Sequence, residues 1–273
     1  MAKNQKQPKK GKQFTGIKSA GLVMLVCLAI AICIFHFVFG NPENFINGDP
    51  HNQAITGNLL GTIYKGGFIV PVIQMLLLTV LSLSVERFFA IKSAQGKGNL
   101  AKFVQEIKTA LTKGDIAGAT AICDKQQGSV GNVVTSALVK YAEVEEDKAL
   151  SKEQQILAIQ KEVEEATALE LPMLSQNLPI IATITTLGTL MGLLGTVIGM
   201  IKSFAALSGG GGTDSIALSA GISEALVNTA FGILTGALAV ISYNYFTSKI
   251  DSLTFCIDEV GFSIVQTFAA SHK

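Results

Sequence analysis

The stretches GTVIGMIKSF, residues 195–204, and GISEALVNTAFG, residues 221–232, decide the fold of this chain. Each lies in an apolar run. Within six positions, however, the second carries the carboxylate of Glu224, the amide of Asn228 and the hydroxyl of Thr229. Polar side chains in hydrocarbon are costly, so they face the protein interior or a water-filled cavity. The two stretches therefore predict membrane helices that pack closely or line a polar passage.

The composition and the apolar runs predict an all-α integral membrane protein with four transmembrane helices. The 273 residues are 49% hydrophobic and 15% charged, which is more apolar than a soluble domain requires. Crossing the bilayer core takes about 20 mainly apolar residues. Four runs meet or approach that length: residues 19–39, 67–90, 178–206 and 218–246.

The first apolar run has two interpretations, a cleaved signal peptide or a retained anchor. A lysine-rich start precedes it, as in a signal peptide. However, it extends over about 20 residues, ends in FHFVF at residues 35–39 and shows no small-residue cleavage pattern. We therefore expect a retained transmembrane helix.

Lysines next to the apolar runs predict the orientation, because basic residues collect in short cytoplasmic loops. Six lysines precede the first run and five more lie between residues 92 and 113, whereas the loop between the first two runs holds only Lys65. Both termini are therefore expected in the cytoplasm. The predicted segments outside the membrane are a basic N-terminus at 1–18, a periplasmic loop at 40–66, a cytoplasmic helical region at 91–177, a glycine-rich periplasmic turn at 207–217 and a cytoplasmic tail at 247–273.

The segments predicted in the cytoplasm have helical patterns. Residues 153–170 form a charged helical stretch that runs toward the third apolar run, with prolines at 172 and 179 that each remove a backbone donor. In the tail, apolar residues recur every three or four positions from Ile250 to Phe268, which predicts an amphipathic extension of the fourth run. We therefore expect long helices that extend from the membrane into the cytoplasm.

The third run carries glycines and hydroxyls at helical spacings. Small residues three or four apart let two helix backbones approach closely, and this run has Gly188, Gly192, Gly195 and Gly199. Four hydroxyls fall within a stripe about 40° wide: Thr185, Thr189, Thr196 and Ser203. A single membrane threonine ordinarily bonds to a carbonyl of its own helix. The stripe therefore has two interpretations, that structural role or a polar lining.

The fourth run has a matching polar stripe. Its members follow the same spacings: Glu224, Asn228, Thr235 and Ser242. Glu224 is expected to exchange a proton, and the alternative is a structural hydrogen bond or a carboxylate near the outer interface. Thr229 lies about 140° round the helix from Glu224, so it cannot share that stripe. Gly232 and Gly236 are expected at close-packing positions.

Several classes of function are not supported by the sequence. No nucleophile–base pair, phosphate loop or Cys/His metal spacing stands out, so we expect neither an enzyme nor a metal or other cofactor. The net charge of +1 argues against a nucleic-acid partner, and the basic N-terminus suits anionic membrane lipid. An intramembrane enzyme with Glu224 as its base remains a weaker alternative, because no second catalytic group accompanies it.

Paired motifs in the last two runs resemble those of the ExbB/TolQ/MotA proton-channel family, with the ExbB and TolQ branch the most similar. The resemblance rests on GLLGTVIGMIKSF at 192–204, GISEALVNTAFGI at 221–233, the second run with its VERF ending at 85–88, and a cytoplasmic stretch at 114–138. It covers about residues 65–250. The chain departs from the family pattern in its front part, where an extra transmembrane helix precedes the three common ones.

The resemblance implies a motor subunit of the bacterial inner membrane. Such subunits form a homo-oligomeric ring, commonly a pentamer, around an ExbD-like single-span partner, and they drive a TonB-like protein in transport across the outer membrane. By motif position, Thr196 and Thr229 line the proton route and Glu224 lies near the inner surface of the ring. The alternatives are a TolQ-like or gliding-motor subunit, or a non-conducting scaffold of four helices in which Glu224 only joins helices.

Overall fold

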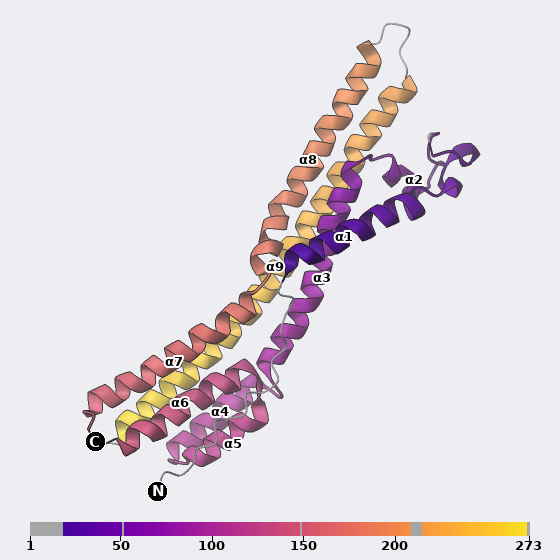
Figure 1. The fold of residues 1–273 in the computed structure, drawn as a ribbon. Helices are drawn as coiled ribbons and strands as arrows, with labels where there is room; N and C mark the ends of the chain where they lie inside the picture. Colours follow the sequence, from indigo (N-terminus) through magenta and orange to yellow (C-terminus); the bar gives the residue numbers. More distant parts are fainter. Residues whose placement is uncertain (1–18, 51, 148, 209–214, 272–273) are drawn as a thin grey trace. The chain divides into compact units, whose positions relative to one another are not determined.

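The computed structural model describes residues 19–50, 52–147, 149–208 and 215–271. The N-terminal lysines and the glycines at 209–212, on which part of the predicted topology rests, lie outside the described residues. The chain divides into two compact units, each built from separate segments (Figure 1). We call residues 17–85 and 177–245 the membrane unit, and residues 86–176 and 246–273 the bundle unit.

The apolar helices confirm the predicted fold class. Within the described residues, four helical stretches are long and apolar enough to cross a membrane: Ala20–Phe39, Ile69–Thr112, Lys152–Leu207 and Ile216–Ser271. The only β-structure in that part of the chain is an isolated bridge between Phe45 and Ala54. The chain is therefore an all-helical membrane protein with four long apolar helices.

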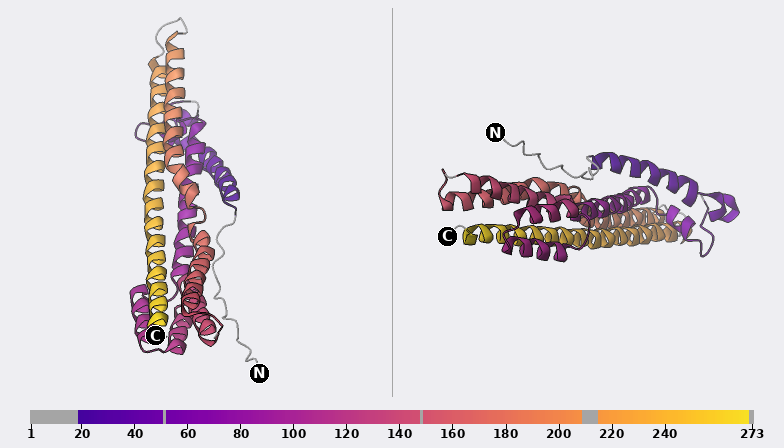
Figure 2. Two further views of the ribbon diagram at one scale, coloured as in Figure 1. Left: turned by 90° about the vertical axis from the view of Figure 1, so that its left-hand side faces the viewer. Right: turned by 90° about the horizontal axis from the view of Figure 1, so that it is seen from below.

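The membrane unit contains α1 and its continuation, the first part of α3, α8 and the first part of α9. Ser19 begins α1 by accepting a hydrogen bond from the backbone amide of Leu22. Figures 1 and 2 show α8 and the first part of α9 side by side. The bounds are α1 Ala20–Ile34, the π-helical turn η1 Phe35–Phe39, α3 Ile69–Gln95, α8 Leu178–Ser208 and α9 Ser215–Ser271.

The segment between α1 and α3 folds into short helices. The buried side chain of Asn44 organises it, since its amide donates to the carbonyls of Val38 and Phe39 and its Oδ1 accepts from Asn58. The ring of Tyr64 stacks on Phe35 with centroids 4.7 Å apart, which joins the end of the segment to the end of the first apolar helix. The helices are η2 Pro42–Asn44, η3 Ile46–Gly48 and α2 Leu59–Tyr64.

The bundle unit combines the end of α3 with α4 to α7 and the last part of α9. Polar caps start its helices: Asn99 caps α4, Asp115 caps α5, and Ser151 with Gln154 forms a capping box on α7. The bounds are α4 Leu100–Thr112, α5 Ile116–Gln126, α6 Gly128–Glu146 and α7 Lys152–Ser175.

The last part of α9 lies in the core of the bundle unit with the apolar residues predicted for the tail. Phe268 is fully buried, and its ring packs edge-to-face on Tyr141 of α6 with centroids 4.9 Å apart. A hydrogen-bonded ion pair of 2.6 Å joins Lys108 of α4 to Glu259. The amphipathic pattern of the tail therefore marks a core helix of the bundle.

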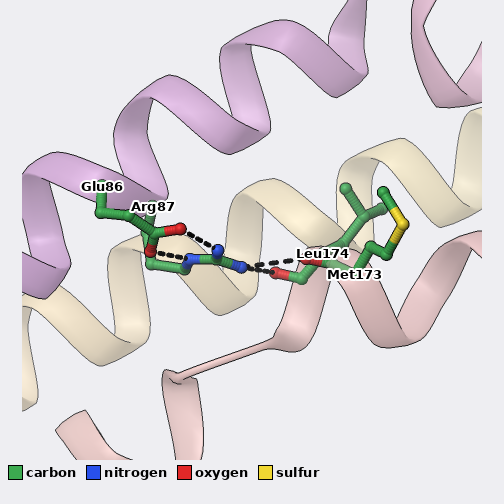
Figure 3. A network of polar contacts seen from close by, with 4 residues as sticks. All are labelled: Glu86, Arg87, Met173 and Leu174. Atoms are coloured by element: carbon green, nitrogen blue, oxygen red, sulfur yellow. Dashed lines mark hydrogen bonds and ion pairs between the residues drawn. The ribbon is translucent and has the colours of Figure 1, made fainter. Parts of the chain in front are cut away.

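A buried guanidinium completes the C-terminal end of α7 (Figure 3). Arg87 has no exposed side-chain surface, and its Nη1 donates to the carbonyl oxygens of Met173 and Leu174 at 3.0 and 3.2 Å. Its Nε and Nη2 pair with the carboxylate of the neighbouring Glu86. The last carbonyls of a helix have no partner within it, so Arg87 satisfies two groups that would otherwise be orphaned.

The charged helix predicted to run into the third apolar run is interrupted at residues 176 and 177. Asn177 has a φ of 66°, a left-handed conformation that ends helical geometry. Pro172 lies inside α7, whereas Pro179 stands in the first turn of α8. There a missing backbone amide costs nothing, because the first amides of a helix have no partner in it.

Candidate functional site

Glycines bring the backbones of α8 and α9 into contact in the membrane unit. A Cβ on Gly232 would lie 2.7 Å from the Cα of Gly192 and 2.8 Å from the carbonyl oxygen of Gly188. Every glycine predicted at a packing position has an atom of the other helix within 3.1 Å of its Cβ position: Gly188, Gly192, Gly195, Gly199, Gly232 and Gly236. At Gly199 and Gly232 the near atoms are backbone atoms of the other helix, so a larger residue there would push the helices apart.

Two predicted hydroxyls meet at this contact. The Oγ1 atoms of Thr196 on α8 and Thr229 on α9 are hydrogen-bonded to each other. Thr229 also donates to the carbonyl of Ala225 at 3.1 Å. Both threonines are half-buried, so the two residues lie at the edge of the helix contact.

Glu224 has a different partner on α8. The ammonium of Lys202 lies 2.6 and 2.9 Å from the two carboxylate oxygens of Glu224. The side chain of Glu224 is 9% exposed and that of Lys202 is 51% exposed. The backbone at Gly67 also approaches so closely that a Cβ there would lie 2.6 Å from Oε1 of Glu224 and 3.8 Å from Nζ of Lys202. The carboxylate is thus enclosed by a glycine turn and a lysine.

The other predicted polar residues do not join these two pairs. Asn228 is fully buried and donates to the carbonyl of Gly66 at 2.8 Å, while its Oδ1 has no hydrogen-bond partner among the described residues. Ser203 donates to the carbonyl of Gly199 on its own helix at 3.1 Å and to the carbonyl of Leu218 on α9 at 3.3 Å. The predicted threonine hydroxyls that remain bond to carbonyls one turn earlier in their own helices, the ordinary structural role of membrane threonines: Thr185, Thr189 and Thr235.

Sequence reasoning missed Lys202. A signal was present, because Lys202 is the only Asp, Glu, Lys or Arg of the predicted run at 178–206. It lies six positions after Thr196, or about 9 Å along the helix axis. The structure therefore places the hydroxyl pair and the ion pair at successive points of one helix contact.

An apolar cavity of about 480 Å³ lies beside Gly67 in the membrane unit. The first apolar helix and the start of α3 both contribute to it, and Cys27 of α1 also approaches Ser82 of α3 at 3.9 Å. The extra helix therefore packs on α3 within this unit. The cavity is lined by Leu28, Ile32, Phe35, His36, Tyr64, Gly67, Phe68, Pro71 and Val72.

The described residues contain no group of three or more His, Cys, Asp or Glu side chains arranged to hold a metal ion. The candidate site thus consists of two hydroxyls, one acid and one base between helices. Such groups can hold and pass protons, since a hydroxyl both donates and accepts a hydrogen bond and a carboxylate accepts a proton.

The chain is similar in sequence to proteins of one described family. A family model described as the MotA/TolQ/ExbB proton channel family matches residues 131–259, which include both pairs. Over 190 residues the chain is 24% identical to the Tol-Pal system protein TolQ of Pseudomonas aeruginosa, an alignment that covers 67% of this chain and 81% of that protein.

Two further relatives are more similar over shorter segments. An ExbB-like biopolymer transport protein of Synechocystis is 40% identical over 88 residues, which cover 32% of this chain and 42% of the relative. The biopolymer transport protein ExbB of Salmonella typhimurium is 33% identical over 85 residues, or 31% of this chain and 35% of the relative. The matched part spans less than half the length of these two relatives.

Proposed function

We propose, on the premise that this chain belongs to the MotA/TolQ/ExbB proton channel family, that it is the ring-forming subunit of a proton-driven motor in the bacterial inner membrane. With an ExbD-like single-span partner it couples proton entry to the movement of a TonB-like protein, which powers transport across the outer membrane. Both termini lie in the cytoplasm in this proposal, and several copies of the chain, commonly five in the family, surround the partner.

The hydroxyl contact between Thr196 and Thr229 is the observation that carries the proposal. It lies where two glycine-rich helices are in backbone contact, so the hydroxyls are held in place by the helices. A hydroxyl pair can take a proton on one side and give one up on the other, since each hydroxyl both donates and accepts. Glu224 supplies an ionisable group along the same helix contact.

Proton flux into vesicles that contain the chain and its ExbD-like partner tests the proposal. Thr196→Val and Thr229→Val keep the side-chain shape and remove the hydroxyl. We expect each to lower flux about ten-fold, which corresponds to one hydrogen bond of about 1.4 kcal/mol. Thr186→Val is the matched control, because Thr186 is exposed on α8 and its hydroxyl bonds to Thr183 of its own helix. Flux at the level of the control in both variants would contradict the proposal.

A TolQ-like role is a second candidate, favoured by the alignment with the Pseudomonas TolQ over most of its length. Such a motor would act in the Tol-Pal system named for that protein instead of a TonB-dependent one. Native mass spectrometry of the complex from its own membrane separates the candidates, because it identifies the single-span partner and counts the subunits. A monomer without a partner would instead favour the scaffold of four helices.

A further inference from the structure

In the described α-helices of the membrane unit, the one acidic and the one basic side chain pair with each other. Among the described residues of α1, α8, the part of α3 up to residue 85 and the part of α9 up to residue 245, Lys202 and Glu224 are the only Lys, Arg, Asp or Glu side chains. They are 22 residues apart in the sequence and form a two-contact ion pair. Each charge therefore has the other as its partner across the helix contact.

Lys202 is the only side chain that donates to Glu224 among the described residues. The neighbouring amide of Asn228 donates to the carbonyl of Gly66 instead. The glycine turn at Gly66 and Gly67 presents no titratable side chain to the carboxylate. While the ammonium contacts both oxygens, neither oxygen is open to another proton donor.

The two partners differ in their freedom to move. Glu224 is 9% exposed and lies against the backbone at Gly67, whereas half of the Lys202 side chain is exposed. A long lysine side chain can carry its ammonium to water while its stem stays on apolar surface. Glu224 cannot follow, and a buried carboxylate left without its partner is costly. Departure of Lys202 therefore favours uptake of a proton by Glu224.

We propose that Lys202 is a gate on proton exchange at Glu224. In the closed state the ammonium occupies both carboxylate oxygens. In the open state Lys202 keeps its three protons and its charge and moves to water, and one proton adds to a carboxylate oxygen of Glu224. When that proton leaves, the ammonium returns. The gate rests on the proposed proton-motor function and identifies the residue that controls it.

Carbodiimide labelling tests the gate, because a hydrophobic carbodiimide reacts with a protonated carboxyl group. Dicyclohexylcarbodiimide is added to vesicles that contain the full chain, and mass spectrometry follows the adduct on Glu224. Lys202→Gln should react at least about ten-fold faster than the wild type, the change in protonated fraction that a neighbouring opposite charge ordinarily makes. Lys202→Arg keeps the charge and should react like the wild type.

The controls separate the gate from general loss of a charge. Lys65→Gln removes a lysine of the same unit that donates to the carbonyl of Pro50, and it should leave the labelling of Glu224 unchanged. Glu224→Gln removes the labelled group. In vesicles without the partner, Lys202→Gln should raise passive proton leak several-fold, and the added Glu224→Gln substitution should abolish that rise.

A wild-type labelling rate in Lys202→Gln, with thermal unfolding and oligomeric state unchanged, overturns the gate. Should that variant fail to assemble, Lys202→Met keeps the apolar stem and gives the same comparison. The gate and the motor fail differently. Unchanged labelling together with loss of flux in Thr196→Val rejects the gate alone, whereas unchanged flux in both threonine variants rejects the motor.

Discussion

Gly67 sets how closely the chain before α3 approaches Glu224. Its φ of 74° lies in the left-handed region, which residues with a side chain adopt at a cost. A Cβ at this position would also lie 2.6 Å from the carboxylate of Glu224. A side chain here would therefore strain the backbone and displace the acid from its lysine.

Gly67→Ala should impair proton flux, whereas Gly57→Ala should not. Gly57 has a similar φ of 85° but open space around its Cβ position, so alanine there carries only the backbone cost of about 1–2 kcal/mol. Thermal unfolding measures this shared cost, and vesicle flux measures displacement of Glu224. Equal flux in the two variants would show that the contact with Glu224 has no functional role.

Individual site residues were predictable only where a motif or a spacing marked them. Thr196, Thr229 and Glu224 followed from the paired motifs, and the spacing argument separated Glu224 from Thr229. In the structure the carboxylate of Glu224 pairs with Lys202, whereas the hydroxyl of Thr229 pairs with that of Thr196. The pairing with Lys202 was not predictable, since it depends on how two helices align across a turn. Local periodicity carries no information on that alignment.

At the scale of the helix, α7 depends on a residue from another element. Arg87 of α3 closes the C-terminus of α7 through two carbonyls and is itself balanced by Glu86 (Figure 3). All of these groups belong to the bundle unit. Removal of the guanidinium would take the donor from two carbonyls and the neighbouring cation from a buried carboxylate.

Arg87→Ala should destabilise the bundle unit by about 3–5 kcal/mol, the usual effect of breaking a buried ion pair. Hydrogen exchange should increase at the C-terminal end of α7. Arg87→Lys should recover little of that stability, because an ammonium lacks the planar fork that bonds several acceptors.

Lys161→Ala is the control on α7, since the side chains of Lys161 and its ion-pair partner Glu165 are 72% and 61% exposed and the pair contributes under about 1 kcal/mol. Equal loss in Arg87→Ala and the control would refute the capping role.

Helix periodicity located most of the elements but not their exact ends. The spacing of apolar residues marked the helical tail, and the length of the apolar runs marked the four membrane helices. Periodicity did not locate the helix break at residues 176 and 177. The prolines at 172 and 179 lie on either side of this break, and neither of them ends a helix. The break lies at the left-handed backbone of Asn177. Asparagine tolerates this conformation, but its presence in a sequence does not predict it.

At the scale of the whole molecule, each unit holds two of the four cysteines, and unfolding of the bundle unit exposes a buried one. Cys123 of α5 is 2% exposed in the bundle unit, and burial raises the pKa of its thiol to about 12. Burial and the charge of Glu259 also raise the pKa of Cys256, which is half-buried. As pH rises from 9.0 toward about 12, the unfolded chain releases a thiol proton that folded Cys123 retains. The bundle unit should lose stability across that range.

Maleimide labelling near neutral pH should therefore modify Cys256 before Cys123. Cys123 should react only when denaturant opens the bundle unit, because its thiol is both buried and protonated. Peptide mass spectrometry reports each cysteine separately, and a Cys256→Ser variant confirms the assignment. Rapid modification of Cys123 without denaturant would contradict the burial of α5 in this unit.

The apolar runs predicted the all-helical membrane fold, since length and hydropathy alone identify such spans. The division into units was not predictable, because α3 and α9 each belong to both of them. The apolar residues of a continuous helix keep the same spacing at the point where the helix passes from one unit to the other. The ring and its partner remain predictions, as they depend on surfaces that a single chain does not identify.

The pairing of Lys202 with Glu224 also determines how an electric field acts on the membrane unit. A transmembrane potential acts on one elementary charge with about 2.3 kcal/mol per 100 mV. The pair as a whole carries no net charge, so the field only tends to orient it. A proton bound to Glu224 leaves the ammonium uncancelled, and the field then pulls on a full charge. In the proposed gate, the step that neutralises the acid is thus the step at which the field first acts on a net charge of this pair.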